Sequence, residues 1–179
     1  MPLTDKQTGV MRGMLLGMSV ALGIVGFGSH LNPFAYPASL TLSDKFSVAF
    51  SSCTIPLLFL AIAIGRLAKH RFLTPADIDG GGLSVGSEQA RVLQSLLQNT
   101  VEQTLFASLV YCAWAAVMPA TFLSTVPIAA LAFALGRILF FAGYKKGAPS
   151  RAIGFTLSFY PSMVMLLAVI TTLIWRQVG

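Results

Sequence analysis

The chain has 179 residues, of which 55% are hydrophobic and only 10% are charged, and its formal net charge is +6. A soluble domain usually carries about 25% charged residues, so this composition excludes an ordinary soluble fold and predicts an integral membrane protein. In such a protein an excess of Lys and Arg reflects how loops are placed across the bilayer, and it does not indicate nucleic-acid binding. The lipid bilayer is therefore the first expected partner.

Five apolar segments approach or reach the roughly 20 residues that a helix needs to cross the hydrocarbon core. In chain order they cover residues 13–29, 46–66, 88–118, 121–145 and 151–176. With five spans most Lys and Arg of the connections fall on one side, and Lys45 and Arg176 fall on the other. The positive-inside rule then predicts a multi-pass protein with a cytoplasmic N-terminus and an external C-terminus, in the inner or plasma membrane if the source is bacterial.

The first segment is short and glycine-rich, with Gly9, Gly13 and Gly17 repeating every four residues. Such a GxxxG face suits close helix packing, either inside one chain or between two chains. No small-x-small cleavage site follows, so the segment is interpreted as a helix and not as a signal peptide. Residues 1–45 are predicted to hold a cytoplasmic tail, this extra transmembrane helix and an external loop. Residues 46–179 are predicted to form a bundle of four helices.

The third segment carries a polar cluster, QNTVEQ at positions 98–103, in an otherwise apolar helix. About 30 helical residues extend roughly 45 Å, so the first turns project from the hydrocarbon and place Glu102 near one interface. Lipid cannot solvate such groups, so their face must meet protein or a water-filled cavity, as a network between helices or as a functional site. That face is lined by Arg91, Ser95, Asn99 and then Glu102 or Gln103.

A carboxylate at this depth is expected to have a cationic partner, and the candidates are Arg137 and Arg151. In the fourth segment Arg137 shares one helix side with Phe140 or Phe141 and with Tyr144. Arg151 opens the fifth segment, beside free backbone N–H groups and the positive end of the helix dipole. This position disfavours a lone cation but suits an anion that the cation and the helix end hold together.

The cysteines and histidines do not indicate a metal or redox site. Cys53 and Cys112 both fall inside apolar segments, so they are predicted to be small core residues and not a disulfide. His30 and His70 are far apart and have no Cys or carboxylate at ligand spacing. No metal cofactor is therefore expected.

Two stretches together resemble the signatures of the MAPEG family, the membrane-associated proteins of eicosanoid and glutathione metabolism. The sequence NTVE at 99–102 is similar to the N-x-x-E signature, and GRILFFAGY at 136–144, followed seven residues later by Arg151, is similar to the second signature. The resemblance covers about residues 46–176. It implies a MAPEG-like four-helix transmembrane bundle, to which the first helix is an extra N-terminal element.

The resemblance also implies a homotrimer that binds glutathione between neighbouring subunits at the cytoplasmic end. An arginine at the position of Arg151 would stabilise the thiolate, because a cation and a helix N-terminus lower the pKa of a thiol. The implied activity is a glutathione-dependent transferase or peroxidase acting on lipophilic electrophiles from the bilayer. The predicted glutathione-binding residues are Asn99, Glu102, Tyr144, Arg137, Lys69, Arg71 and Arg91.

Four positions depart from the pattern of catalytic members and remove expected ligands: Ser95, Leu97, Gln103 and Phe140. Arg91 lies one turn from Ser95 on the same face and is a candidate substitute for the arginine expected there. Two alternatives to an enzyme therefore stay open. One is a non-catalytic assembly or regulatory subunit that binds other membrane subunits. The other is a small transporter that uses Glu102 and Arg137 as a charge relay.

Overall fold

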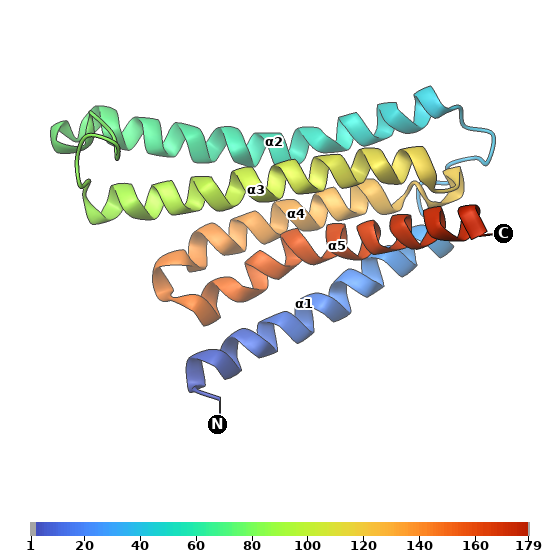
Figure 1. Ribbon diagram of the computed structural model, residues 1–179, viewed down its shortest axis with the longest axis horizontal. Helices are drawn as coiled ribbons and strands as arrows, with labels where there is room; N and C mark the ends of the chain where they lie inside the picture. The colour runs from blue at the N-terminus through green and yellow to red at the C-terminus, as the bar shows by residue number, and fades with distance from the viewer. Residues whose placement is uncertain (1–2, 179) are drawn as a thin grey trace.

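The computed structural model describes residues 3–178, and their regular structure is helical (Figure 1). The five α-helices are α1 (Asp5–His30), α2 (Leu42–Leu73), α3 (Glu88–Val117), α4 (Thr125–Gly143) and α5 (Ala148–Val178). Single turns of 3₁₀ helix lie at Pro75–Asp77, Ala120–Phe122 and Tyr144–Lys146. The prediction of an all-α bundle with an additional N-terminal helix is confirmed.

Helices α2 to α5 form a four-helix bundle, and α1 lies outside it. In the bundle α2 packs on α3, α4 packs on α5, and these two pairs contact each other through α2 with α4 and α3 with α5. Helix α1 packs mainly on α5, touches α4, and crosses α5 obliquely (Figure 1). The start of α1 and the end of α5 lie at opposite ends of the bundle, because five successive helices run alternately in opposite directions.

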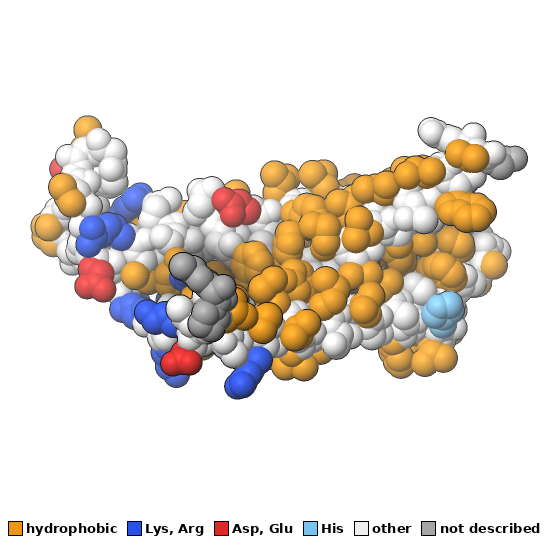
Figure 2. Space-filling model, turned by 60° about the horizontal axis from the view of Figure 1, so that its bottom comes forward, with side chains coloured by type: hydrophobic (Ala, Val, Ile, Leu, Met, Phe, Trp, Pro, Cys, Tyr) orange, Lys and Arg blue, Asp and Glu red, His pale blue; other side chains and the backbone are white. Residues whose placement is uncertain are grey.

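Four of the five helical stretches are long and apolar enough to cross a membrane: Asp5–His30, Leu42–Leu73, Ala120–Lys146 and Ala148–Val178. Helix α3 is equally long but more polar, and it runs antiparallel to α2 along the same length of the bundle (Figure 1). Lys and Arg side chains gather at one end of the molecule, and hydrophobic side chains cover much of the remaining surface (Figure 2). This charged end, where α2 leads into α3 and α4 into α5, is called the basic end.

The helices extend further than hydrophobicity predicts. Helix α2 begins at Leu42, because Thr41 and Asp44 form a capping box that satisfies free backbone N–H groups ahead of the apolar stretch. Thr4 and Gln7 cap α1 in the same way. Apolar composition marks only the part of a helix that meets lipid, whereas a cap marks where the helix starts.

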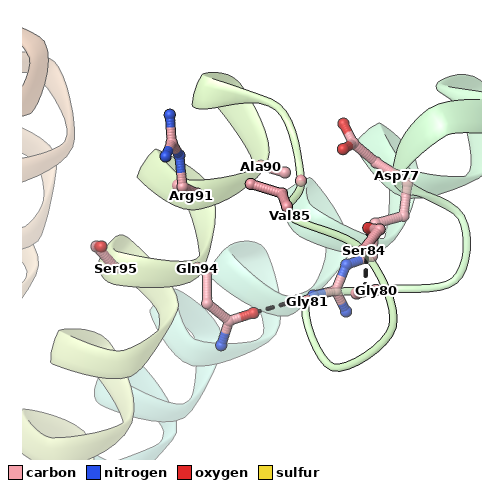
Figure 3. A pocket seen from close by; sticks show the side chains of 11 residues that line it. Asp77, Gly80, Gly81, Ser84, Val85, Ala90, Arg91, Gln94 and Ser95 are labelled. Atoms are coloured by element: carbon pink, nitrogen blue, oxygen red, sulfur yellow. Dashed lines mark hydrogen bonds between the residues drawn. The ribbon is translucent and has the colours of Figure 1, made fainter.

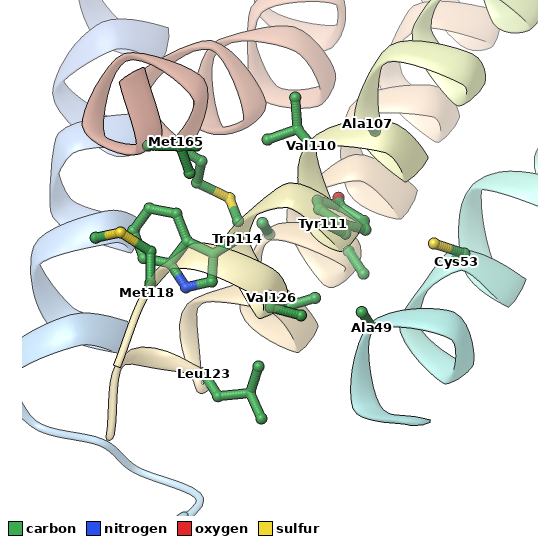
Figure 4. Packing of buried hydrophobic residues seen from close by; sticks show 14 of the residues in the cluster. Ala49, Cys53, Ala107, Val110, Tyr111, Trp114, Met118, Leu123, Val126 and Met165 are labelled. Carbon is green, nitrogen blue, oxygen red and sulfur yellow. The ribbon is translucent and has the colours of Figure 1, made fainter. Parts of the chain in front are cut away.

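Large aromatic side chains fill the centre of the bundle (Figure 4). Tyr111 and Trp114 of α3 are fully buried, and the indole Nε1 of Trp114 donates to the carbonyl of Phe122 at 3.0 Å. Cys53 is buried, Cys112 is half-buried, and both are free thiols, as predicted. At the end remote from the basic end, Lys45 and Arg176 donate to the last carbonyls of α3, those of Met118 and Val117.

The glycine face of α1 packs within the chain, against α5 and the start of α4. A methyl group added at Gly13 would lie 2.9 Å from the Cβ of Ala152, and one added at Gly28 would lie 2.6 Å from the Cα of Thr125. At Gly17 the added carbon would overlap the side chain of Thr156. These glycines allow the two backbones to approach closely, so the face is an intrachain contact.

We predict that Gly17→Ala separates α1 from α5 and lowers the free energy of unfolding by about 1–3 kcal/mol, the usual cost of overpacking. Gly23→Ala is the matched control on the same helix, because open space surrounds Gly23. Losing a helical glycine there should raise stability by about 0.5–1 kcal/mol. Thermal unfolding in detergent compares the two variants, and equal shifts would contradict the packing described here.

Candidate functional site

The guanidinium of Arg137 lies at the centre of a polar network inside the bundle. It is fully buried, and it donates to Asn99 Oδ1 at 2.9 Å, to Gln103 Oε1 at 3.0 Å and to Ser158 Oγ at 2.7 Å. The rings of Phe140 and Phe133 lie 4.4 and 5.6 Å from its Cζ atom. Neutral oxygens from α3 and α5 and the faces of two rings therefore solvate this cation.

This network has a clear physical basis in helix geometry. Asn99 and Gln103 are four residues apart, so both amides project from one face of α3 toward α4. Arginine presents a fork of N–H donors, and two amide oxygens and a hydroxyl accept from its two terminal nitrogens, whereas the buried Nε has no partner among the described residues. Because a buried charge without partners is very costly, these bonds fix the register of α3, α4 and α5 against one another.

The expected pairing of Glu102 with Arg137 or Arg151 is wrong within a single chain. Glu102 is exposed on the outer face of α3, and its carboxylate accepts a 2.7 Å bond from Gln98 Nε2 on the same helix. Among residues 3–178 the one contact within 4 Å between a basic and an acidic side chain is that of His70 with Asp77. A helix turns about 100° per residue, so Gln103 faces inward and Glu102 faces outward.

A pocket of about 430 Å³ lies at the basic end, between the start of α3 and the loop that precedes it (Figure 3). Arg71 at the end of α2 and Arg91 on α3 both line it, together with Gln94, Ser95 and loop residues from Asp77 to Gly86. Arg71 Nη2 donates to Gln94 Oε1 at 3.1 Å. The structure thus brings Arg71 and Arg91 to one concave, glycine-rich and positively charged surface, which has the chemistry of an anion site.

The carboxylate of Asp77 holds the loop of this pocket onto α3. Its Oδ1 accepts from the backbone N–H of Ser87 at 2.7 Å, and its Oδ2 accepts from Ser87 Oγ at 2.6 Å and lies 2.8 Å from His70 Nε2. Ser87 is also the N-cap of α3, since its hydroxyl accepts from the N–H of Ala90. These bonds hold the pKa of Asp77 below its ordinary value, and the bond from the Ser87 side chain has the largest effect.

Arg151 and Tyr144 form a second charged feature at the same end. The 3₁₀ turn Tyr144–Lys146 and Gly147, whose φ of +99° suits glycine, reverse the chain between α4 and α5. Arg151 lies in the first turn of α5, is half-buried, and its Cζ atom lies 4.4 Å from the centre of the Tyr144 ring. Tyr144 in turn packs edge-on against Phe140. The ring holds a cation beside the free N–H groups of a helix start.

The predicted site residues thus fall into separate groups within one chain. Asn99 and Arg137 are bonded inside the bundle, Arg71 and Arg91 share the loop pocket, and Tyr144 and Arg151 lie together at the start of α5. Lys69 is exposed and lines a different groove of about 280 Å³, next to Arg66, His70 and Gln89. Lys69 and Arg71, both near the end of α2 and both predicted to bind glutathione, are therefore separated, and only Arg71 lines the loop pocket.

Comparison with known proteins identifies the family. The profile of the MAPEG family matches residues 46–171, from α2 through most of α5. The chain belongs to the MAPEG family. Its relative from Synechocystis sp. (strain ATCC 27184 / PCC 6803 / Kazusa), described as "Uncharacterized protein sll1147", is 29% identical over 131 residues, which span 69% of this chain and 83% of that protein. No solved structure matches the chain.

MAPEG membership establishes a multi-pass helical membrane protein and supports, in general terms, a transferase, peroxidase or related function in the membrane. Proteins of this family generally use glutathione as a substrate. The matched region begins after α1, so this MAPEG protein carries α1 in addition to the family's helices. The substitution at Gln103 has a structural explanation here, because the side chain is buried and holds Arg137.

Sequence reasoning missed the roles of four residues. Ser158 bonds Arg137 but lies in a segment with no motif around it. Asp77 and Ser87 fasten the loop, and the only signal was the helix-capping preference of Ser87 just before α3. Gln94 bonds Arg71, and this contact depends on how the loop between α2 and α3 folds.

We predict that Gln103→Leu lowers the free energy of unfolding by about 1–3 kcal/mol, because Arg137 loses one buried acceptor. Gln177→Leu makes the same chemical change at an exposed position near the end of α5 and should alter stability by less than about 0.5 kcal/mol. Thermal unfolding in detergent measures both. A Gln103→Leu variant as stable as the Gln177→Leu control would show that the network does not hold the bundle together.

We predict that protonation of Asp77 at low pH releases the loop that borders the loop pocket. A carboxyl group whose pKa is depressed by folding contributes stability above its ordinary pKa of 3.8, and that stability is lost as pH falls through the lower, folded value. Cleavage of residues 78–86 by pepsin should therefore rise as pH falls below 3.8. Asp77→Asn should be cleaved readily above that pH, whereas the exposed control Asp79→Asn should behave as wild type.

Proposed function

We propose that the protein is a glutathione-dependent transferase or peroxidase of the membrane, acting on lipophilic electrophiles, with Arg151 stabilising the thiolate. The observation that carries this proposal is the setting of Arg151. The side chain is half-buried in the first turn of α5, its guanidinium lies 4.4 Å from the ring of Tyr144, and it borders an almost wholly apolar cavity. A thiolate would meet a cation and free N–H groups there, next to space for an apolar molecule.

The chemistry requires a thiolate and a route for an apolar reactant. A cation and a helix N-terminus lower the pKa of a bound thiol and raise the fraction of the nucleophilic form at neutral pH. The sulfur then forms a bond to the electrophilic carbon, and the leaving group departs with its electron pair. Since Arg151 remains charged throughout, its role is to stabilise negative charge and not to transfer a proton.

A complete glutathione site is proposed to form between neighbouring copies of a homotrimer. Glu102 is exposed in the single chain, on a helix face that also exposes the apolar side chains of Val101, Leu105 and Leu109. A carboxylate among lipid-facing residues is costly, so a second copy is the suitable cover for this face. There Glu102 would bind the amine of glutathione, and Arg71 and Arg91 of the loop pocket would bind its carboxylates.

A non-catalytic assembly subunit is the second candidate, favoured by the bond that Asn99 already makes to Arg137. That bond occupies the Asn99 oxygen, which a bound glutathione would otherwise use as an acceptor. The glycine face of α1, which had suggested a contact with other subunits, is instead used inside the chain. The transporter hypothesis loses its basis, because Glu102 is exposed while Arg137 is buried and bonded to other groups.

We predict that the purified protein binds glutathione at up to millimolar concentration and that Arg151→Ala lowers the rate of conjugation by about 100-fold, as removal of one charge-stabilising group does in other active sites. Lys146→Ala, which removes an exposed cation from the neighbouring turn, is the matched control and should keep the wild-type rate.

Native mass spectrometry of the protein released from detergent counts subunits and bound thiol in the same peak. Trimers carrying glutathione in the wild-type protein are expected. A failure to bind thiol at millimolar concentration, or a rate unchanged in Arg151→Ala, would refute the enzyme proposal and leave the assembly subunit as the better explanation.

A further inference from the structure

A cavity of about 240 Å³ lies between α1 and the bundle, at the basic end of the molecule. Val10 and Met14 of α1 form its outer wall, and Phe140 of α4 and Phe155 and Tyr160 of α5 form much of its inner wall. Arg151 supplies the charge of a lining that is otherwise almost entirely apolar. We name this space the α1 cavity.

The cavity exists because of how α1 is attached. Gly13 and Gly17 bring the two backbones together at Ala152 and Thr156, and α1 crosses α5 at an angle (Figure 1). The close contact continues at Gly9, where an added carbon would lie 2.9 Å from the Cβ of Pro149. The cavity lies beside this line of glycines, where the larger side chains of Val10 and Met14 face α4 and α5. Residues 46–171, which match the family, supply the inner wall only, so the complete cavity is a feature of this chain's own N-terminal helix.

The lining indicates the chemistry of the ligand. Aromatic rings and the flexible thioether of Met14 suit a flat or branched apolar molecule, and such side chains adapt to different shapes. Met14 is 45% exposed, so one side of the cavity opens to the surface that α1 presents to the bilayer. A molecule dissolved in the membrane could enter there, and its inner end would lie at Arg151, the residue proposed to hold the thiolate.

We propose that the α1 cavity binds the apolar body of the lipophilic co-substrate and that Val10 and Met14 determine which co-substrates fit. This inference rests on the proposed function, which identifies the ligand as an electrophile. For an aryl halide, the glutathione sulfur forms a C–S bond, the halide leaves with the bonding electrons, and the thiol proton is released to solvent. The α1 residues take no part in these steps and act by shape alone.

Photolabelling tests occupancy without requiring any catalysis. The full-length protein in lipid nanodiscs is exposed to an aryl diazirine, and labelled residues are mapped by mass spectrometry. Labelling of Met14 and Tyr160 should saturate with probe concentration and should be displaced by 1-chloro-2,4-dinitrobenzene. Labelling that rises linearly with probe concentration would show that membrane lipid, not a bound ligand, occupies this space, and it would overturn the proposal.

Two variants test the wall formed by α1. Val10→Trp fills the cavity and should reduce saturable labelling, and it should lower kcat/KM for 1-chloro-2,4-dinitrobenzene about tenfold, within the range for one change in an apolar pocket. Val20→Trp is the matched control on α1, because Val20 does not line the cavity, and it should match wild type. Equal effects of the two tryptophans would overturn the proposal. Met14→Ala should shift the preference toward bulkier aryl halides, and an unchanged preference would count against it.

The two proposals can fail separately. If glutathione does not bind but labelling still saturates and Val10→Trp abolishes it, the α1 cavity is a ligand site and the assignment of the co-substrate thiol is wrong. If glutathione binds and Arg151→Ala is inactive while Val10→Trp keeps wild-type kcat/KM, the enzyme proposal stands and the role of α1 is refuted.

Discussion

A charged guanidinium inside a membrane bundle has to be solvated by protein groups, because lipid cannot do so. In this protein the packing of α3, α4 and α5 supplies those groups to Arg137. Arg137 takes its hydrogen-bond acceptors from α3 and α5 and lies against aromatic rings of its own helix. Moving any one of the three helices by a turn would remove an acceptor. The same bonds orient Asn99 and Gln103 toward the interior, and Glu102 consequently lies on the outer face of α3. The hydrogen bonds of one buried cation therefore determine which polar groups of α3 can contact a ligand.

The number and order of the helices could be predicted from hydrophobic length, and the family from two short motifs. The orientation of neighbouring polar residues could not, because Glu102 and Gln103 differ by one step of about 100° around α3 and either could face inward. The expectation of a carboxylate partner for Arg137 failed because neutral amide and hydroxyl oxygens accept from both terminal nitrogens of the guanidinium without burying a second charge. The Asp77 contact depends on a loop whose sequence shows only flexibility and helix capping.

Two kinds of surface lie at the basic end: a charged pocket suited to glutathione and an apolar cavity suited to a lipophilic reactant. The loop pocket carries the charged side chains of Arg71 and Arg91, whereas the α1 cavity is almost wholly apolar and is lined in part by Met14. Arg151 belongs to the apolar side but carries the charge that a thiolate seeks. In a single chain these surfaces are separate, so the face of α3 that exposes Glu102 is where a neighbouring copy would have to connect them.

Helix α1 covers one side of α5 that membrane lipid would otherwise cover, and it is covalently attached to the bundle. Acyl chains that would otherwise cover Ala152 and Thr156 are replaced by a backbone, whose Gly13 carbonyl accepts a 3.3 Å bond from the Thr156 hydroxyl. A lipid exchanges with the bulk membrane, and its acyl chains offer no hydrogen-bond acceptor. Helix α1 does not exchange, and its Gly13 carbonyl is such an acceptor. The environment of this flank of α5 is consequently set by the chain itself and is insulated from changes in the lipid composition of the host membrane.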